Sequence, residues 1–430
     1  MSYDSQLAIL GGSPVQNKPF QFNNAIGIEE KEAVMKVLEA GELSGFIASA
    51  GEAFHGGRKV RELQELMAEF FGVKHAVAVN SATSGLHAAV YATKVGPGDE
   101  IITSPYTMSA TSTAILMCGA TPIFADIEDE TFGLDPASVE ACITPQTKAI
   151  LAVNIFGHPA RLDKLKAIAE KHKLYLIEDN SQAPAARHNG RFTGTIGDMG
   201  VFSFNRHKVM QSGEGGVVLT DDDELAMRMA LLRNHGEAVV DAMGIQDIVN
   251  TAGLNLRMTE MEAAVAVEQF KKLPRLNSER QELAARLDRH VRNTSFLQEP
   301  NVAEADEHVY YMYPMKFDAK VAGFTRDAFV KAMMAEGAVV RAGYLRPTFL
   351  EPIFQKKTFL GQTGFPFSAN PRNKEISYAP GLCPVCEELN DNRIVMTYIM
   401  QPPQTLADMD LFGLALQKIT DNAKELANLG

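Results

Sequence analysis

Residues 75–92, HAVAVNSATSGLHAAVYA, contain a short apolar run that ends at Asn80 and a segment of helical spacing that begins at Ser81. The run is apolar at successive positions, which is typical of a strand buried on both faces of its sheet. A strand followed directly by a helix is the repeating unit of parallel sheets covered by helices. This stretch therefore predicts an α/β fold.

The same unit recurs along residues 61–218, which predicts a mainly parallel sheet between two layers of helices. Apolar runs closed by Gly, Pro, Asn or Asp predict further strands at residues 100–105, 121–126, 147–154, 174–179 and 200–204. Helical spacing predicts helices at residues 61–72, 81–96, 111–119 and 162–173.

The pattern changes after Val218. Residues 222–236 and 258–291 have helical spacing, and we expect Pro274 to break or kink the second, which is long enough to link two domains. Strands and helices then follow at coarser spacing, up to a final helix at residues 406–429. We therefore expect an N-terminal segment and large domain over residues 1–275 and a smaller α+β C-terminal domain over residues 276–430.

Composition argues against several classes of protein. The 430 residues carry 53 acidic and 41 basic side chains, a net charge of −12, whereas a general nucleic-acid surface needs a basic footprint. No apolar run approaches the roughly 20 residues that span a bilayer, and the N-terminus lacks a basic region before its apolar patch. We expect a cytoplasmic protein that binds neither nucleic acid nor membrane.

The four cysteines are too few for a disulfide framework: Cys118, Cys142, Cys383 and Cys386. The last two form a C-x-x-C pair, but no second pair follows at zinc-ligand spacing. We expect no bound metal.

Three groups of polar residues follow predicted strands, where open α/β sheets place their ligands. The first is Ser81, Ala82 and Thr83. Backbone amides and hydroxyls at a helix N-terminus suit a phosphate dianion, although serine and threonine there also serve as ordinary caps.

The second group is Glu178, Asp179 and Gln182, after the strand at residues 174–177. A carboxylate at a strand's end can hold a pyridinium nitrogen protonated, so that the ring accepts electrons. The alternative is that Asp179 caps the following turn.

The third group lies in GDMGVFSFNRHKVMQSGEGG, residues 197–216, where Lys208 follows Ser203 by five positions. Lysines are usually solvated, but this one lies among apolar and small residues, where desolvation would lower its pKa toward that of a nucleophile. The glycines do not have the G-x-G-x-x-G spacing of a dinucleotide site.

Seven blocks in register resemble the sugar aminotransferase family named DegT/DnrJ/EryC1/StrS, within the fold type I aspartate aminotransferase superfamily. They are GVKHAVAVNSATSGLHAA, GDEIITSPYTMSAT, GATPIFADI, VNIFGHPARLD, IEDNSQAPAA, GDMGVFSFNRHKVMQSGEGG and GLNLRMTEMEAAV. The resemblance implies a seven-stranded, mainly parallel sheet, pyridoxal 5'-phosphate as cofactor, and transfer of an amino group.

The resemblance also implies roles for particular residues. Lys208 matches the Schiff-base lysine that moves the proton, Asp179 the partner of the pyridine nitrogen, and Gln182 a residue near the ring's O3'. The phosphate cradle matches Ala82, Thr83 and Ser203. Asn255 matches an asparagine that reaches the phosphate from a neighbouring subunit, which implies a homodimer with shared active sites.

Two positions leave alternatives open. Met108 stands where the family usually has an aromatic residue over the ring; its thioether can pack on a ring face, or Tyr106 takes that role. Some family members carry histidine in place of the lysine and dehydrate sugars, and His207 is adjacent, but Lys208 is in register with both Ser203 and Gly213.

The implied reaction is a ping-pong exchange from glutamate or glutamine to a keto or aldehyde carbon of a nucleotide-linked, free or acidic sugar or a cyclitol. Candidate substrate contacts are His207, His308, Arg341, Tyr344 and Arg346, of which the arginines can pair with an acidic group. A sugar dehydratase of the same family, or a non-catalytic regulator that binds the cofactor, are the alternatives.

Overall fold

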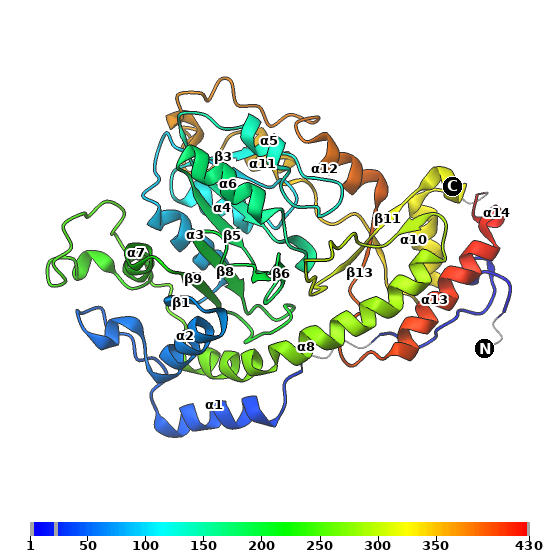
Figure 1. Ribbon diagram of the computed structural model, residues 1–430, viewed down its shortest axis with the longest axis horizontal. Coiled ribbons are helices and arrows are strands. Elements are labelled where there is room, and N and C mark those ends of the chain that lie inside the picture. The colour runs from blue at the N-terminus through cyan, green and yellow to red at the C-terminus, as the bar shows by residue number, and fades with distance from the viewer. Residues whose placement is uncertain (1–3, 21–24, 428–430) are drawn as a thin grey trace.

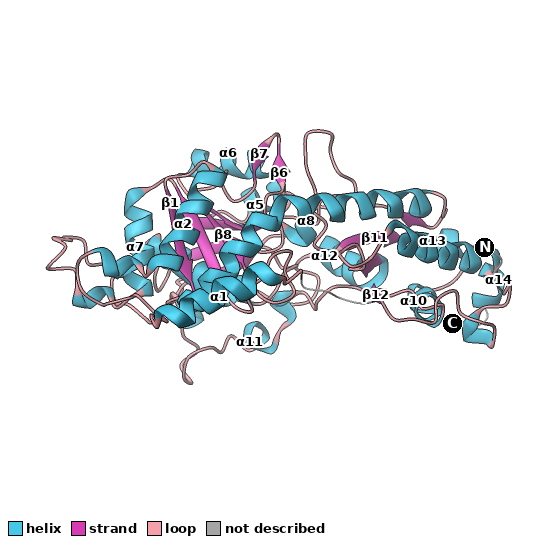
Figure 2. Cartoon of the chain, turned by 90° about the horizontal axis from the view of Figure 1, so that it is seen from below, coloured by secondary structure: helices cyan, strands magenta, loops and turns pink. Residues whose placement is uncertain are grey.

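The computed structural model describes residues 4–20 and 25–427. Two parts, each built around a sheet, are joined by the long helix α8 (Glu260–Arg292), which runs from one part to the other (Figures 1 and 2).

The large part contains a seven-stranded sheet, as the resemblance implied. Its order is β1 (His75–Val79), β9 (Gly216–Thr220), β8 (Met199–Ser203), β5 (Tyr175–Asp179), β4 (Thr147–Val153), β2 (Glu100–Thr103) and β3 (Thr121–Phe124). Strand β9 is antiparallel to both of its neighbours, and the remaining pairs are parallel. The prediction of a mainly parallel sheet is therefore confirmed, while β9 was not among the predicted strands.

Helices cover both faces of this sheet because alternate strand residues point to opposite sides. One face packs against α3 (Ala82–Ala92), α4 (Ala110–Met117) and α7 (Asp223–Arg233). The other face packs against α2 (Arg58–Phe71), α5 (Pro136–Ala141), α6 (Leu162–His172) and the first half of α8. Helix α1 (Ile28–Ala40) lies against α8, and β6 (Arg187–His188) pairs with β7 (Arg191–Phe192).

The small part has an antiparallel sheet in the order β10 (Leu297–Gln298), β11 (Tyr313–Phe317), β13 (Ile394–Thr397) and β12 (Arg341–Ala342). Its core is shared with the second half of α8, α10 (Arg326–Ala335) and α13 (Leu406–Asp421). The short helices α9 (Ala319–Ala322) and α14 (Ala423–Leu426) complete it.

The N-terminal segment packs on the small part, although the sequence-based division grouped it with the large domain. Leu7 is buried in the small part's core. The buried carboxylate of Glu336 accepts hydrogen bonds from the backbone amides of Ala8 and Val15 at 2.8 and 3.1 Å, and it pairs with Lys418 at 2.8 Å.

Helix α8 continues through Pro274, so the expected break does not occur. Pro274 donates no backbone hydrogen bond, but it lies on the exposed side of the helix, where water can reach the carbonyl left without a donor. Leu273 and Leu276 are buried on the other side and hold the helix in place. The proposed domain boundary at residue 275 therefore lies inside a continuous helix.

A segment from the C-terminal half returns to the large part and carries α11 (Pro352–Gln355), which is drawn near β3 in Figure 1, and α12 (Pro384–Glu388). Its aromatic residues pack on Phe124 and Phe156. Cys383 and Cys386 are buried in the same cluster as free thiols, and burial raises the pKa of both.

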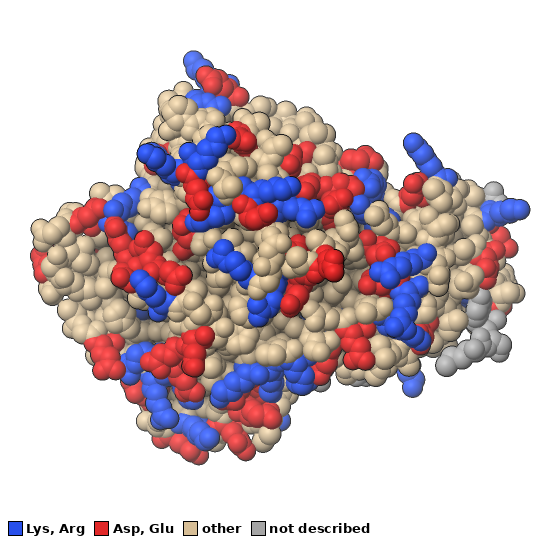
Figure 3. Space-filling view, viewed as in Figure 1, with Lys and Arg blue, Asp and Glu red and all other residues tan. Residues whose placement is uncertain are grey.

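Acidic and basic side chains alternate over the face drawn in Figure 3, and no broad basic patch is seen there. Over residues 4–20 and 25–427, no helix is both long and apolar enough to cross a membrane.

Glu178 and Asp179 end strand β5, and strand alternation sends their side chains to different places. The buried carboxylate of Glu178 accepts hydrogen bonds from the backbone amides of Gly194, Ile196 and Gly197 at 2.6 to 2.8 Å. It therefore anchors the loop before β8, while Asp179 is free for another role.

We predict that Glu178→Gln destabilises the protein by about 3 kcal/mol, because an amide NH2 would face backbone donors in a buried site. The midpoint of urea unfolding, followed by circular dichroism, measures the change. Glu170→Gln on the exposed face of α6 is the matched control and should shift the midpoint little. Equal midpoints for the two variants would contradict the anchoring role.

Candidate active site

Two neighbouring parallel strands of the large sheet present polar residues where they end. Asp179 is the last residue of β5, Ser203 is the last residue of β8, and the loop after β8 carries Lys208. Because β5 and β8 are neighbours, the two strand ends are adjacent. Sequence-distant residues are thus brought to one place.

Asp179 is 6% exposed, and neighbouring residues fix its carboxylate. The Thr111 hydroxyl donates to Oδ2 at 2.9 Å, and the Ser181 amide donates to Oδ1 at 3.2 Å. Neither partner carries a charge, so the carboxylate can still interact with a cation in the site.

Lys208 supplies that cation. Its Nζ lies 4.7 Å from the centre of the Tyr311 ring, and it makes no hydrogen bond or ion pair with any residue in the described part of the chain. Burial lowers the pKa of Lys208 to about 8, although the charge of Asp179 acts in the opposite direction. A neutral amine, which is the nucleophilic form, is therefore accessible close to neutral pH.

A candidate phosphate cradle is formed at the N-terminus of the eleven-residue helix α3. Ser203 pairs with Gly216, and a Cβ added to Gly216 would lie 2.7 Å from the Ala82 amide nitrogen. The first amides of a helix, here those of Ala82 and Thr83, have no intrahelical acceptor. A bare backbone at Gly216, free amides and a hydroxyl together fit a phosphate group.

Gln182 joins the large part to a residue from the small part. Its Oε1 accepts from the Phe156 amide at 2.8 Å, and its Nε2 donates to the Tyr344 hydroxyl at 3.2 Å. Burial and the nearby charge of Asp179 raise the pKa of Tyr344. The structure therefore brings Tyr344 next to Asp179 and Gln182.

Other residues predicted for the site are exposed around Asp179, Lys208 and Gln182 or lie away from them. His207 is exposed, with its ring 6.3 Å from that of Tyr311. Arg341 and Arg346 are exposed, and Arg341 donates to the backbone oxygen of Tyr344. Asn255 is also exposed within its own chain.

His308 is 2% exposed and packs elsewhere. It stacks on Tyr310 at 4.0 Å between ring centres, meets His158 edge-on, and accepts a hydrogen bond from the Tyr310 amide. Within the described ranges, no hydrogen bond, ion pair or ring contact joins its side chain to Asp179, Lys208 or Gln182.

The two residues considered for ring stacking differ in exposure. Met108 is 56% exposed, whereas Tyr106 is buried and meets Tyr344 and Phe156 edge-on. Tyr106 donates to Oδ1 of Asn390 at 3.3 Å.

Tyr311 and Thr111 were not among the site residues predicted from the sequence. Tyr311 is one of three tyrosines in the run HVYYMYPM, and Thr111 lies in a segment that reads as an ordinary helix start. The role of Tyr311 becomes visible only when the small part packs on the large one. Thr111 could have been predicted because it carries a hydroxyl close to the end of a predicted strand.

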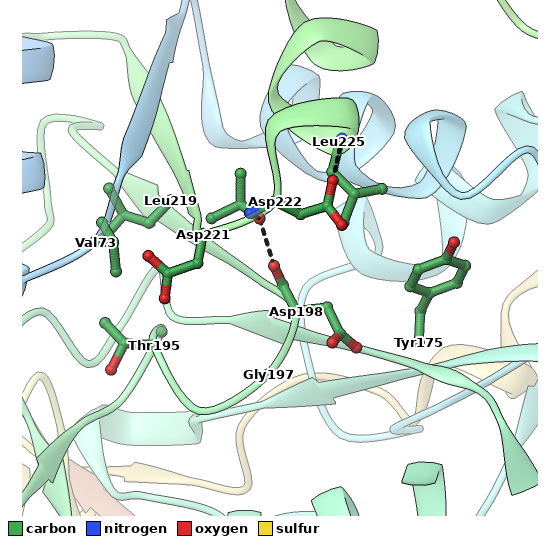
Figure 4. A pocket seen from close by; sticks show the side chains of 11 residues that line it. Val73, Tyr175, Thr195, Gly197, Asp198, Leu219, Asp221, Asp222 and Leu225 are labelled. Atoms are coloured by element: carbon green, nitrogen blue, oxygen red, sulfur yellow. Dashed lines mark hydrogen bonds between the residues drawn. The ribbon is translucent and has the colours of Figure 1, made fainter.

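A separate cavity of about 310 Å³ lies at the opposite ends of the strands from Asp179 and Ser203, near the start of β5 and β8 (Figure 4). Its acids already have partners. Asp198 accepts from Lys166 at 2.9 Å and from the Leu176 amide at 2.7 Å, and Asp222 caps α7. Asp179 and Ser203 lie at the opposite ends of these strands.

A sequence profile described as the DegT/DnrJ/EryC1/StrS aminotransferase family matches residues 37–394. The spore coat polysaccharide biosynthesis protein SpsC of Bacillus subtilis (strain 168) is 35% identical over 358 residues, 82% of this chain and 89% of SpsC. The GDP-perosamine synthase of Caulobacter vibrioides is 36% identical over 282 residues, 65% of this chain and 75% of that protein.

The fold agrees with these sequence relations. A solved structure of DesI in the presence of its TDP-sugar product superposes with a TM-score of 0.80 at 28% identity, covering 99% of each chain. The fold type I architecture and the need for pyridoxal phosphate are thereby confirmed. The chain belongs to the DegT/DnrJ/EryC1/StrS family of pyridoxal phosphate-dependent sugar aminotransferases.

Proposed function

We propose that this enzyme transfers an amino group from glutamate or glutamine to a keto or aldehyde carbon of a sugar or cyclitol, in a ping-pong exchange. The observation that carries the proposal is the Lys208 amine, which has no acceptor among the described residues and whose pKa responds to Asp179. The printed names of two relatives, a GDP-perosamine synthase and a protein solved with a TDP-sugar product, favour a nucleotide-linked sugar as acceptor.

Bound pyridoxal phosphate supplies an aldehyde that can hold an amino group and a ring that accepts electrons. The Ala82 and Thr83 amides and the Ser203 hydroxyl would hold its phosphate. Asp179, fixed by Thr111, would keep a proton on the pyridine nitrogen, and Gln182 would contact the ring's oxygen side.

Lys208 would hold the cofactor covalently and then act as the proton-transfer group at Nζ. A pKa of about 8 suits both roles, because the amine can accept a proton and release it close to neutral pH. The Tyr311 ring beside Nζ limits the directions in which the flexible side chain can swing.

Tyr344 is the best-supported substrate contact, because its hydroxyl already reaches Gln182. The exposed guanidinium groups of Arg341 and Arg346 can pair with phosphates of a nucleotide-linked sugar. We further propose that two chains form a homodimer in which the exposed Asn255 of each reaches the phosphate site of the other.

Glutamate or glutamine, added without acceptor, should change the visible absorbance of the cofactor in the holoenzyme, because the cofactor takes up the amino group. Adding a suitable keto sugar nucleotide should restore the original spectrum. Stopped-flow or steady-state absorbance measures both steps. If no amino acid changes the spectrum, the transaminase proposal is wrong.

Lys208→Ala should abolish covalent attachment of the cofactor. After borohydride reduction, intact-mass analysis should find the added cofactor mass on the wild type and on Lys331→Ala, an exposed-lysine control on α10. The mass should be absent from Lys208→Ala. Retention of the cofactor mass by Lys208→Ala would refute the lysine assignment.

A further inference from the structure

A buried arginine without a counter-charge lies on the far side of β1 from the catalytic residues. Arg233, the last residue of α7, is 1% exposed. Its Nη1 donates to Gln64 Oε1 at 2.9 Å and to the Ala78 carbonyl at 3.0 Å, and its guanidinium lies 4.9 Å from the centre of the Phe46 ring. All three partners are neutral.

Arginines at this depth are normally paired with an acid, because an uncompensated buried charge is costly. Arg233 forms no ion pair within the described residues, and its Nε has no acceptor there. Burial lowers the pKa of Arg233 to about 9. Gln64 occupies the place where a glutamate of the same length would neutralise the charge, so the chain itself does not supply the missing anion.

A cavity of about 510 Å³ opens beside Arg233, between α2, β1 and α7. Arg61 and His55 also line it. Arg61 donates to the Gly56 carbonyl at 2.6 Å, and its one ion pair within the described ranges is with the exposed Glu52, at 3.1 Å. The pKa of His55 is lowered by burial and by the charges of Arg233 and Arg61, which indicates a positive field in the cavity.

Two acids also line the cavity, and neither neutralises this end of it. Asp223 is engaged by His75 at 2.7 Å and by Lys74 at 3.8 Å. Glu65 is exposed. Three permanent cations, those of Arg61, Lys74 and Arg233, therefore face two carboxylates, and the buried cation is the one left without a partner.

We propose that this cavity is a binding site for a small oxyanion, a phosphate or carboxylate group, held by Arg233 and Arg61 with a hydrogen bond from His55. Planar guanidinium groups suit both anions. The volume accommodates the anion together with a small organic group, which favours a phosphorylated or carboxylated metabolite over a free ion.

The proposed site is joined to the phosphate cradle of the active site by backbone contacts. The Arg233 carbonyl accepts from the Leu256 amide at 3.0 Å, and the Leu256 carbonyl accepts from the Asn80 amide at 2.9 Å. Asn80 directly precedes Ser81, the N-cap of α3, and Asn255 directly precedes Leu256. An anion on Arg233 would therefore bind close to two segments proposed to hold the cofactor phosphate. These are the N-terminus of α3 and the segment that carries Asn255.

Calorimetric titration of the holoenzyme with inorganic phosphate tests the proposal, because the loaded cofactor already fills the catalytic phosphate cradle. The wild type should bind one phosphate per chain at this site. Gln64→Glu places a carboxylate against Nη1 and should weaken phosphate binding at least tenfold. The exchange preserves side-chain length and the oxygen that accepts from the Ala78 amide and from Arg233. It replaces the donor at 3.5 Å from the His55 carbonyl with an oxygen, and the new ion pair with Arg233 offsets that loss, so folding should persist.

Glu65→Gln is the matched control. It removes a negative charge at the exposed rim of the cavity, whereas Gln64→Glu adds a negative charge beside Arg233. The Glu65→Gln variant should bind phosphate as tightly as the wild type or more tightly.

Arg61→Gln should weaken binding without touching Arg233. Acetate in place of phosphate distinguishes a carboxylate site from a phosphate site. Absence of binding, or equal affinity in wild type, Gln64→Glu and Arg61→Gln, would overturn the proposal.

Discussion

The active site depends on the pKa of the Lys208 amine, which burial lowers and the charge of Asp179 raises. Burial favours the neutral amine, whereas the charge of Asp179 favours the ammonium, and the balance moves its pKa from 10.5 to about 8. About one amine in ten is then neutral at pH 7, against fewer than about one in a thousand at the ordinary lysine value. The scaffold must therefore fix both residues, because displacing either one changes how much nucleophile is present.

The fold fixes these residues from three directions. Strand β5 carries Asp179 to the carboxyl end of the sheet, where its charge acts on Lys208, and alternation along the strand turns Glu178 away to anchor a loop. Helix α4 contributes Thr111, whose hydroxyl orients that carboxylate. The small part, carried on the unbroken helix α8, places the Tyr311 ring against the amine.

Much of this arrangement could be predicted from sequence because buried parallel strands leave continuous apolar runs, and their carboxyl ends share an edge. Asp179 became a candidate on that ground and Lys208 because of its apolar and small neighbours, while their roles came from the family resemblance. The direction of β9 is not encoded in its local apolar run, and the continuity of α8 through Pro274 depends on the packing of its buried side. Tyr311 could not be distinguished from its neighbouring tyrosines, because only the docking of the two parts decides which ring meets Lys208.

Titration of the Lys208 amine in the apoenzyme tests this electrostatic balance most directly. Nuclear magnetic resonance of lysine labelled at Cε, with the signal assigned by its loss in Lys208→Arg, follows protonation at this one position. A midpoint near pH 8 is expected, moving lower in Asp179→Asn because the opposing charge is removed. A midpoint near 10.5, unchanged by Asp179→Asn, would contradict both the burial of the amine and its coupling to the carboxylate.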